Sequence, residues 1–332
     1  MIGTAQANSA DWRRLYPFAP HWIELPAGRM HYVDEGPENN GANDAVETLL
    51  FVHGNPTWSF HWRQLIQGLR WRFRCVAPDH LGCGLSDKPR RFLRLSDHIE
   101  SLCALVDQLG IKRLTLVAQD WGGAIGLGAM LRMPERFERI VLFNTGAFPP
   151  RGIPWRIRAC RLPLLGRLAV QGANLFSRAA LRMTVSRRRL EPAVRAGYLV
   201  PYDSWSNRRA VYGFVKDIPA PRRRVFPKLA AESRRDSATW KTLADMERRL
   251  PMFADRPICL IWGMRDWCFR ADCLERFAEA WPQAECHRLA DVGHWVVEDS
   301  PEEALVIVER FLGQSKNVHH RDTEGTEKRA VV

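Results

Sequence analysis

The sequence Val117-Ala118-Gln119-Asp120-Trp121-Gly122-Gly123 joins an apolar, strand-like run at 113–117 to a helix-like run at 124–132. Small residues stand two positions before and two positions after the central aspartate, at Ala118 and Gly122. They let a strand and a helix approach closely enough to hold the central side chain exposed on a strained turn, which is known as a nucleophile elbow. Serine is the usual residue at the centre of such a turn. Here it is Asp120, and this exchange limits the reactions that the chain can perform.

Strand-like and helix-like segments alternate on both sides of the elbow. A continuous apolar run of the kind that lies buried in a parallel sheet occurs at 48–52, and further strand-like runs occur at 74–78, 139–143 and 257–262. Two strands are expected within 21–35, a last strand near 285–289, and helices at 96–109, with Ser96 as its N-cap, and from Pro301. This alternation predicts a mainly parallel sheet flanked by helices, with its site at the carboxyl ends of the strands.

One region interrupts the alternation. After Phe148-Pro149-Pro150 the chain becomes rich in Arg and Pro, is helix-like, and has no convincing strand until about residue 238. We therefore expect an insertion that forms a helical cap over the sheet. The predicted organisation is a first core part at 1–148, a helical cap at 149–238, a second core part at 239–313 and a polar, disordered tail at 314–332.

The charge is concentrated in the predicted cap. The whole chain carries +12, and residues 151–236 contain 20 Lys and Arg against 5 Asp and Glu. Because no nucleic-acid-binding motif surrounds these arginines, we expect a solvated or self-associating face, not a nucleic-acid or membrane surface. We find neither a secretory signal nor an apolar run long enough to span a bilayer. The 8 scattered cysteines are typical of reduced thiols in a cytoplasmic protein.

Three polar residues follow three of the predicted strands. Asp120 comes first, Asp266 stands in the loop after the strand at 257–262, and His294 follows the last strand. Nucleophile, acid and histidine occur in this order in the triad of the α/β-hydrolase fold. Each residue alone is weak evidence, since a loop aspartate or histidine is usually structural. The order and the elbow together predict an α/β-hydrolase fold with this triad as its catalytic centre.

At this point the sequence resembles the haloalkane dehalogenases, over nearly the whole chain from Trp22 to Leu312. The resemblance is carried by five motifs: His53-Gly54-Asn55-Pro56-Thr57, Gly82-Cys83-Gly84-Leu85-Ser86-Asp87-Lys88-Pro89, Gln119-Asp120-Trp121-Gly122-Gly123, Trp262-Gly263-Met264-Arg265-Asp266 and Gly293-His294. One group of the family has a Glu after the strand that precedes the cap. Here that position reads Phe143-Asn144-Thr145-Gly146, without a carboxylate, so the resemblance implies Asp266 as the acid and Asn55 with Trp121 as halide donors.

The chemistry of these residues fits the resemblance. An aspartate is ionised at neutral pH, so Asp120 can displace a halide from an sp³ carbon without a base, leaving an alkyl ester on the enzyme. The side-chain N–H groups of Trp121 and Asn55 can stabilise the departing halide. His294, oriented by Asp266, would activate the water that hydrolyses the ester. The expected substrate is a small halogenated aliphatic compound. The expected products are an alcohol, a proton and a halide ion, and neither a metal nor an organic cofactor is required.

Several alternatives stay open. Phe148, Pro219 and Trp295 line an apolar substrate pocket or belong to the core. An epoxide hydrolase would use the same triad with two cap tyrosines as proton donors, and Tyr198, Tyr202 and Tyr212 lie in the insertion. A non-catalytic interaction protein is the alternative of another class. A serine esterase is disfavoured because Ser86 lies in a turn and not at an elbow. Self-association is compatible with the basic cap.

Overall fold

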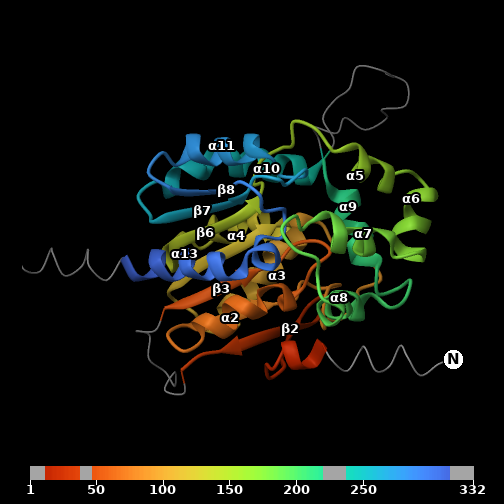
Figure 1. Cartoon of the computed structure of the whole chain (residues 1–332), viewed down its shortest axis with the longest axis horizontal. Helices are drawn as coiled ribbons and strands as arrows, with labels where there is room; N and C mark the ends of the chain where they lie inside the picture. Colours follow the sequence, from red (N-terminus) through yellow and green to blue (C-terminus); the bar gives the residue numbers. More distant parts are fainter. Residues whose placement is uncertain (1–11, 38–46, 220–236, 315–332) are drawn as a thin grey trace, which may run out of the picture.

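The computed structural model describes residues 12–37, 47–219 and 237–314. Its centre is a sheet of eight strands in the order β1-β2-β4-β3-β5-β6-β7-β8 (Figure 1). Strands β1 and β2 are antiparallel to their neighbours, and the pairs from β4 to β8 are parallel. The strands are β1 His21–Leu25, β2 Gly28–Glu35, β3 Thr48–Val52, β4 Arg74–Pro78, β5 Leu114–Asp120, β6 Phe137–Thr145, β7 Ile258–Gly263 and β8 Glu285–Leu289.

Successive side chains of β3 show why the sheet is covered on both faces. Leu50 and Val52 belong to one apolar cluster, whereas Leu49 and Phe51 belong to another. Side chains alternate between the two faces of a strand, so an uninterrupted apolar run provides a core to both. The predicted α/β-hydrolase fold, a mostly parallel sheet flanked by helices, is confirmed.

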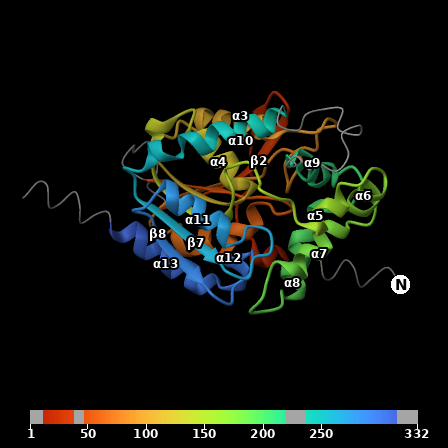
Figure 2. The same cartoon turned by 90° about the horizontal axis from the view of Figure 1, so that it is seen from above.

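Helices pack on the two faces, as the view from above shows (Figure 2). One cluster contains residues of α3 Leu95–Gln108, α4 Trp121–Met130, α10 Ala238–Arg249 and α11 Ala271–Ala280. The other contains residues of α2 Arg63–Leu69, α12 Val296–Asp299 and α13 Pro301–Gln314. The short 3-10 segments of the core are η1 Trp12–Leu15, η2 Ser59–Trp62, η3 Pro134–Arg136 and η8 Leu250–Phe253.

A group of short helices projects from one end of the sheet and forms the cap (Figures 1 and 2). It consists of α5 Trp155–Cys160, α6 Leu165–Arg167, η4 Leu168–Gly172, α7 Leu175–Met183, α8 Pro192–Leu199, η5 Val200–Tyr202 and α9 Arg209–Asp217. These elements lie inside the predicted insertion at 149–238, and α10 begins at Ala238. The predicted disordered tail falls on residues 315–332, which lie outside the described residues, apart from Gln314 at the end of α13.

One boundary differs from the prediction. Helix α3 begins at Leu95, so Ser96 lies inside its first turn and is not the N-cap. The first turn is stabilised by Asp97, whose carboxylate accepts a hydrogen bond from the backbone N–H of Arg94. Between residues 12 and 314, leaving out 38–46 and 220–236, no helix is long and apolar enough to cross a membrane.

Candidate active site

The backbone at Asp120 has the strain expected of a nucleophile elbow. Its φ of 53° and ψ of −129° lie where residues other than glycine are rarely found. Strand β5 ends at Asp120 and α4 begins at Trp121, so the carboxylate is presented at the strand-to-helix turn. A β-carbon at Gly122 would collide with the carbonyl oxygen of Val52, and one at Gly54 would collide with the Asp120 carboxylate. The glycines therefore let the elbow fit against the end of β3.

His294 and Asp266 lie on one side of Asp120, which we call the base side. His294 Nδ1 is 2.7 Å from Asp266 Oδ2, and His294 Nε2 is 3.6 Å from Asp120 Oδ2. The side chains of Asp266, His294 and Asp120 are only 0%, 7% and 12% exposed, so their charges interact with little screening by water. The structure thus brings together the three residues that the sequence predicted as a triad.

The environment sets the protonation of two of these groups. Burial raises the pKa of Asp120 above its ordinary value, although His294 and the backbone N–H groups of Asn55 and Trp121 oppose the shift. Burial alone would lower the pKa of His294, but the carboxylates of Asp266 and Asp120 more than offset it, so the pKa is raised. His294 therefore holds its proton to a higher pH than a free histidine does.

Asn55 and Trp121 lie on the other side of Asp120, which we call the donor side. The backbone N–H of Asn55 donates to Asp120 Oδ1 at 2.7 Å. Its side-chain Nδ2 donates to the carbonyl of Val211 in α9 at 3.2 Å, which leaves the second N–H of the amide for another acceptor. The Trp121 ring lies 5.4 Å from the ring of Phe214, also in α9. Both predicted halide donors are therefore beside Asp120, and both contact the cap.

Buried polar residues that the sequence analysis did not single out hold the base side in place. Asn144 donates to the carbonyls of Gly263 and Phe269 and accepts the N–H of Gly263 at 2.7 Å. It thereby fastens the end of β6 to the end of β7 and to the loop that carries Asp266. Asn144 is part of the Phe143–Gly146 stretch that lacks a carboxylate. Its only sequence signal was a polar residue at the end of a buried strand.

Two residues next to Asp120 make similar hydrogen bonds between loops and strands. Gln119 Nε2 donates to the backbone carbonyl of His294 at 2.5 Å. Thr145 Oγ1 donates to the backbone carbonyl of Asp120, also at 2.5 Å. These bonds run between strand ends that are far apart in the sequence. They tie the backbone of the elbow to the histidine loop and to β6.

The cap tyrosines bear on the epoxide-hydrolase alternative. The hydroxyl of Tyr198 donates to Glu298 Oε1 at 2.6 Å, and that of Tyr202 donates to the carbonyl of Thr57 at 3.0 Å. Both are buried and engaged away from Asp120. Tyr212 packs its ring against Phe92. An epoxide hydrolase would need two tyrosine hydroxyls beside Asp120 to donate protons to the epoxide oxygen. In this structure the hydroxyls of Tyr198 and Tyr202 donate to other groups instead.

The three residues predicted to line a substrate pocket are buried in different surroundings. Phe148 packs on Phe277 with Arg276 over its ring, and Trp295 stacks on Tyr198 at 4.4 Å. Pro219 is buried beside the end of α9. Their role in binding substrate stays a prediction.

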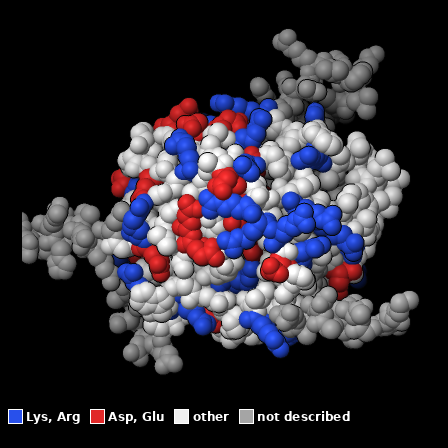
Figure 3. Space-filling model, viewed as in Figure 1, with Lys and Arg blue, Asp and Glu red and all other residues white. Residues whose placement is uncertain are grey.

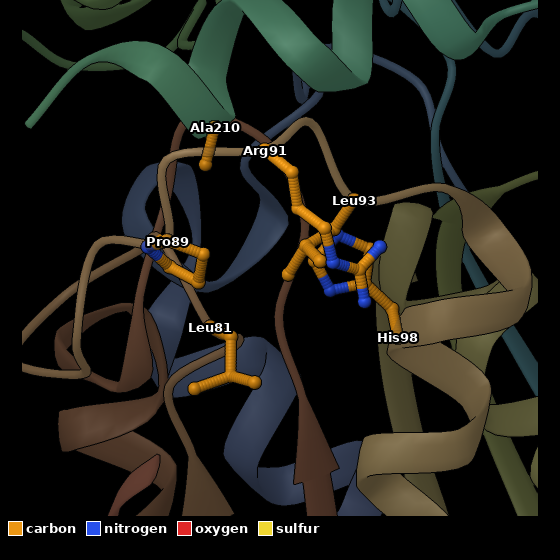
Figure 4. Close-up of a pocket in the computed structure, with 7 residues that line it drawn as sticks. Leu81, Pro89, Arg91, Leu93, His98 and Ala210 are labelled. Carbon is orange, nitrogen blue, oxygen red and sulfur yellow. The ribbon is translucent and has the colours of Figure 1, made fainter. Parts of the chain in front are cut away.

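A small surface pocket lies elsewhere, with an empty volume of about 230 Å³ that includes open solvent (Figure 4). It is lined by Leu81, Gly82, Pro89, Arg91, Leu93, His98 and Ala210, with Arg91 extending toward His98. His98 stacks on Phe214, the ring that also touches Trp121. The Phe214 ring therefore lies between His98 of the pocket and Trp121 of the donor side. Among the described residues, no cluster of three side chains could hold a metal ion.

Proteins of known function resemble this chain over most of its length. It is 35% identical over 311 residues to the cis-3-alkyl-4-alkyloxetan-2-one decarboxylase of Shewanella oneidensis, covering 92% of this chain and 91% of that protein. It is 38% identical over 310 residues to the enzyme of the same name from Xanthomonas campestris, covering 90% and 97%. It is 34% identical over 303 residues to haloalkane dehalogenase 2 of Mycobacterium tuberculosis, covering 90% and 96%.

The structure and a family model agree with these similarities. The crystal structure of an ancestral haloalkane dehalogenase, AncHLD2, superposes with a TM-score of 0.76 at 25% identity, covering 90% of this chain and 99% of that one. The model of the alpha/beta hydrolase fold matches residues 47–301. The resemblance to haloalkane dehalogenases is confirmed, but relatives of two activities share it. The chain therefore belongs to the α/β-hydrolase family, as a homologue of both the oxetanone decarboxylases and the haloalkane dehalogenases.

Proposed function

We propose that this protein decarboxylates cis-3-alkyl-4-alkyloxetan-2-ones, which are four-membered β-lactones, to cis-alkenes and carbon dioxide. The observation that carries the proposal is a carboxylate nucleophile, Asp120, at the elbow of a chain that matches two decarboxylases of this name over 90% or more of its length. A β-lactone and a haloalkane both have an sp³ carbon bonded to a leaving group. One carboxylate can therefore attack either substrate.

The proposed reaction has two steps, and both balance. In the first, Asp120 attacks the ring carbon that bears the ring oxygen, and the carbon–oxygen bond breaks with its electron pair going to the lactone carboxylate. In the second, the bond to that carboxylate breaks and releases carbon dioxide. Its electrons form the alkene while the ester bond to Asp120 breaks. The carboxylate of Asp120 is regenerated, and neither water nor a net proton is consumed.

The stereochemistry follows from the same scheme. In-line attack inverts the oxygen-bearing carbon. Loss of carbon dioxide and of Asp120 from opposite faces then turns the cis-lactone into the cis-alkene. Both alkyl chains need apolar surroundings, and Phe214 beside Trp121 is a candidate surface for one of them.

The residues around Asp120 support this role. The backbone N–H of Asn55, 2.7 Å from Asp120 Oδ1, orients the attacking carboxylate. The free N–H of the Asn55 amide and the indole N–H of Trp121 can stabilise the leaving carboxylate, since both belong to the donor side. The His294 cation on the base side stabilises the regenerated carboxylate of Asp120 when the ester bond breaks.

Product analysis tests the proposal. Purified protein is incubated with a synthetic cis-3,4-dialkyl β-lactone, and alkene and carbon dioxide are quantified by gas chromatography. We expect equal amounts of the two products, with the alkene in the cis form. Formation of the β-hydroxy acid, or no turnover of lactones with several chain lengths, would contradict the proposal.

Haloalkane dehalogenation is the second candidate. Its specific support is the pair of side-chain donors, Asn55 and Trp121, beside the nucleophile, together with the mycobacterial dehalogenase relative. In this reaction a neutral His294 would activate water to hydrolyse the ester. Halide release from brominated, chlorinated and iodinated alkanes tests it. Release at a rate well above that of alkene formation from lactones would make dehalogenation the main activity.

A further inference from the structure

The outer surface of the cap combines exposed leucines with exposed arginines. Seven of the 13 large apolar side chains that are exposed among the described residues lie between 155 and 205. Six of them come from α5, α6, η4, α7 and the turns between these elements, which lie side by side in both views (Figures 1 and 2). We call these six the cap patch: Trp155 67%, Leu162 50%, Leu164 71%, Leu165 67%, Leu168 47% and Leu175 54% exposed.

The backbone at Leu164 is strained, and its side chain is exposed. Leu164 has φ 56° and ψ −61°, and the N–H of Leu165 donates to the carbonyl of Pro163 at 2.6 Å. These angles and this bond define a γ-turn of the hand that is rare and strained for an L-residue. Strained positions persist where the surroundings hold them, and they cluster at functional sites. Here the turn presents a leucine, where glycine would fit without strain, at the most exposed point of the patch.

The segment that carries the cap patch contains basic residues and no acidic ones. Residues 151–190 contain 10 arginines and no Asp or Glu. Arg156, Arg158, Arg167, Arg178 and Arg182 are exposed, and no carboxylate of the described residues pairs with them. In α7, Leu175, Arg178 and Arg182 are spaced to share one exposed face. In Figure 3 basic side chains, with a few acidic ones near them, lie beside a largely uncharged edge, at the end of the molecule where Figure 1 places α5, α6 and α7.

We propose that the cap patch docks this protein on an anionic lipid bilayer, with the leucines in the interfacial region and the arginines against the lipid phosphates. Exposed apolar side chains, among them Trp155, together with exposed Arg side chains are the composition of surfaces that lie in a membrane interface. Each arginine near an anionic bilayer adds an electrostatic contribution that salt weakens. This inference concerns a peripheral contact and does not depend on the reaction proposed above.

Other occupants fit the surface less well. A second copy meeting the same face would bring its arginines against these arginines, without a carboxylate between 151 and 190 to pair with them. Nucleic acid would pair with the arginines but would leave the leucines in water. The sequence alone favoured a solvated or self-associating face. The exposure of the leucines, which the irregular helix spacing concealed, changes that interpretation.

Vesicle binding tests the proposal on the full-length protein. The wild type is centrifuged with vesicles of pure phosphatidylcholine, or of equal parts phosphatidylcholine and phosphatidylglycerol, at low and high salt. We expect binding to the mixed vesicles, weakened by salt, and little binding to the neutral ones. Leu164→Glu with Leu165→Glu should lower the partition coefficient by about tenfold or more, since burying one leucine is worth more than a factor of ten.

Two further variants separate docking from folding. Val306→Glu is the matched control. Val306 is a 63% exposed apolar residue on α13, outside the cap, and this variant should bind vesicles as the wild type does. Leu164→Gly should raise the melting temperature by relieving the strained turn while weakening vesicle binding. The proposal is overturned if the wild type does not bind mixed vesicles or if Val306→Glu loses as much binding as the leucine variants. It is also overturned if the leucine substitutions only dissociate an oligomer, because the face is then a contact between copies.

Discussion

The base side and the donor side of Asp120 are held by different parts of the molecule. On the base side, His294 and Asp266 stand 2.7 Å apart on loops that Asn144 and Gln119 fasten to the ends of the sheet strands. On the donor side, Asn55 binds the carbonyl of Val211 and Trp121 packs on Phe214, both in cap helix α9. The base side is thus held by the sheet, whereas the two predicted halide donors contact the insertion.

In the mechanism proposed above, this difference would let the same nucleophile, acid and histidine serve either of two reactions. A nucleophile, an acid and a histidine at strand ends allow attack on carbon and the resolution of an ester, whichever group departs. In this account the donor side and the cap that contacts it determine which leaving group departs. They also determine whether the alkyl ester is hydrolysed by water or broken by loss of carbon dioxide. Variants on the two sides should therefore fail in different ways.

The largest effect should come from the residue that both sides share. Asp120→Asn removes the nucleophile and should lower alkene formation by about four orders of magnitude or more. Haloalkane turnover, where present, should be lost as well. Initial rates measure this, and circular dichroism checks the fold. Asp255→Asn, at a carboxylate whose side chain is 82% exposed, should retain full activity. Appreciable turnover by Asp120→Asn would remove Asp120 from the mechanism.

The next effect should come from the donor side. Trp121→Phe keeps an aromatic ring against Phe214 but removes the indole N–H, and should lower kcat by about a hundredfold with little change in KM. The reason is that the leaving group gains charge mainly in the transition state. Trp71→Phe, at an exposed indole, is the control. A change in KM alone would show that Trp121 binds substrate without assisting departure.

The charge of His294 on the base side should determine how the rate of alkene formation depends on pH. The pKa of His294 is raised by Asp266 and Asp120 against the effect of burial, so the cation persists to a higher pH than in a free histidine and is lost as the pH rises through this raised pKa. If the cation assists decarboxylation, activity has an alkaline limb. Asp266→Asn removes a carboxylate that raises the pKa and should move that limb to lower pH. Activity that instead rises with pH through the His294 titration would indicate a neutral base and hydrolysis of the ester by water.

The smallest effect should come from the positioning residues. Asn144→Ala leaves the N–H of Gly263 and the carbonyl of Phe269 without their partner and should lower the free energy of unfolding by about 1–3 kcal/mol. Urea unfolding measures it. Turnover should fall only a few-fold, because Asp266 stays in place with a looser support. If Asn144→Ala keeps the free energy of unfolding of the wild type but loses all activity, Asn144 takes a direct part in the reaction.

The features that could be predicted from the sequence are those that a local residue pattern or the chain order determines. The run at Thr48–Val52 identified a strand buried on both faces, and chain order identified Asp120, Asp266 and His294 at strand ends. The hydrogen bonds of Gln119 and Asn144 could not be predicted, because their partners are defined only once the sheet is assembled. The exposure of Leu164 was also hidden, since its γ-turn lies between short helices where no periodicity separates an outer face from an inner one.

A single turnover in ¹⁸O-labelled water tests the central claim most directly. Excess protein is mixed with a cis-3,4-dialkyl β-lactone, the alkene is quantified, and the peptide that contains Asp120 is weighed by mass spectrometry. We predict cis-alkene from the wild type and none from Asp120→Asn, with Asp120 left unlabelled, because loss of carbon dioxide regenerates the carboxylate without water. Label in Asp120, accompanied by β-hydroxy acid in place of alkene, would contradict the account and show that water resolves the ester.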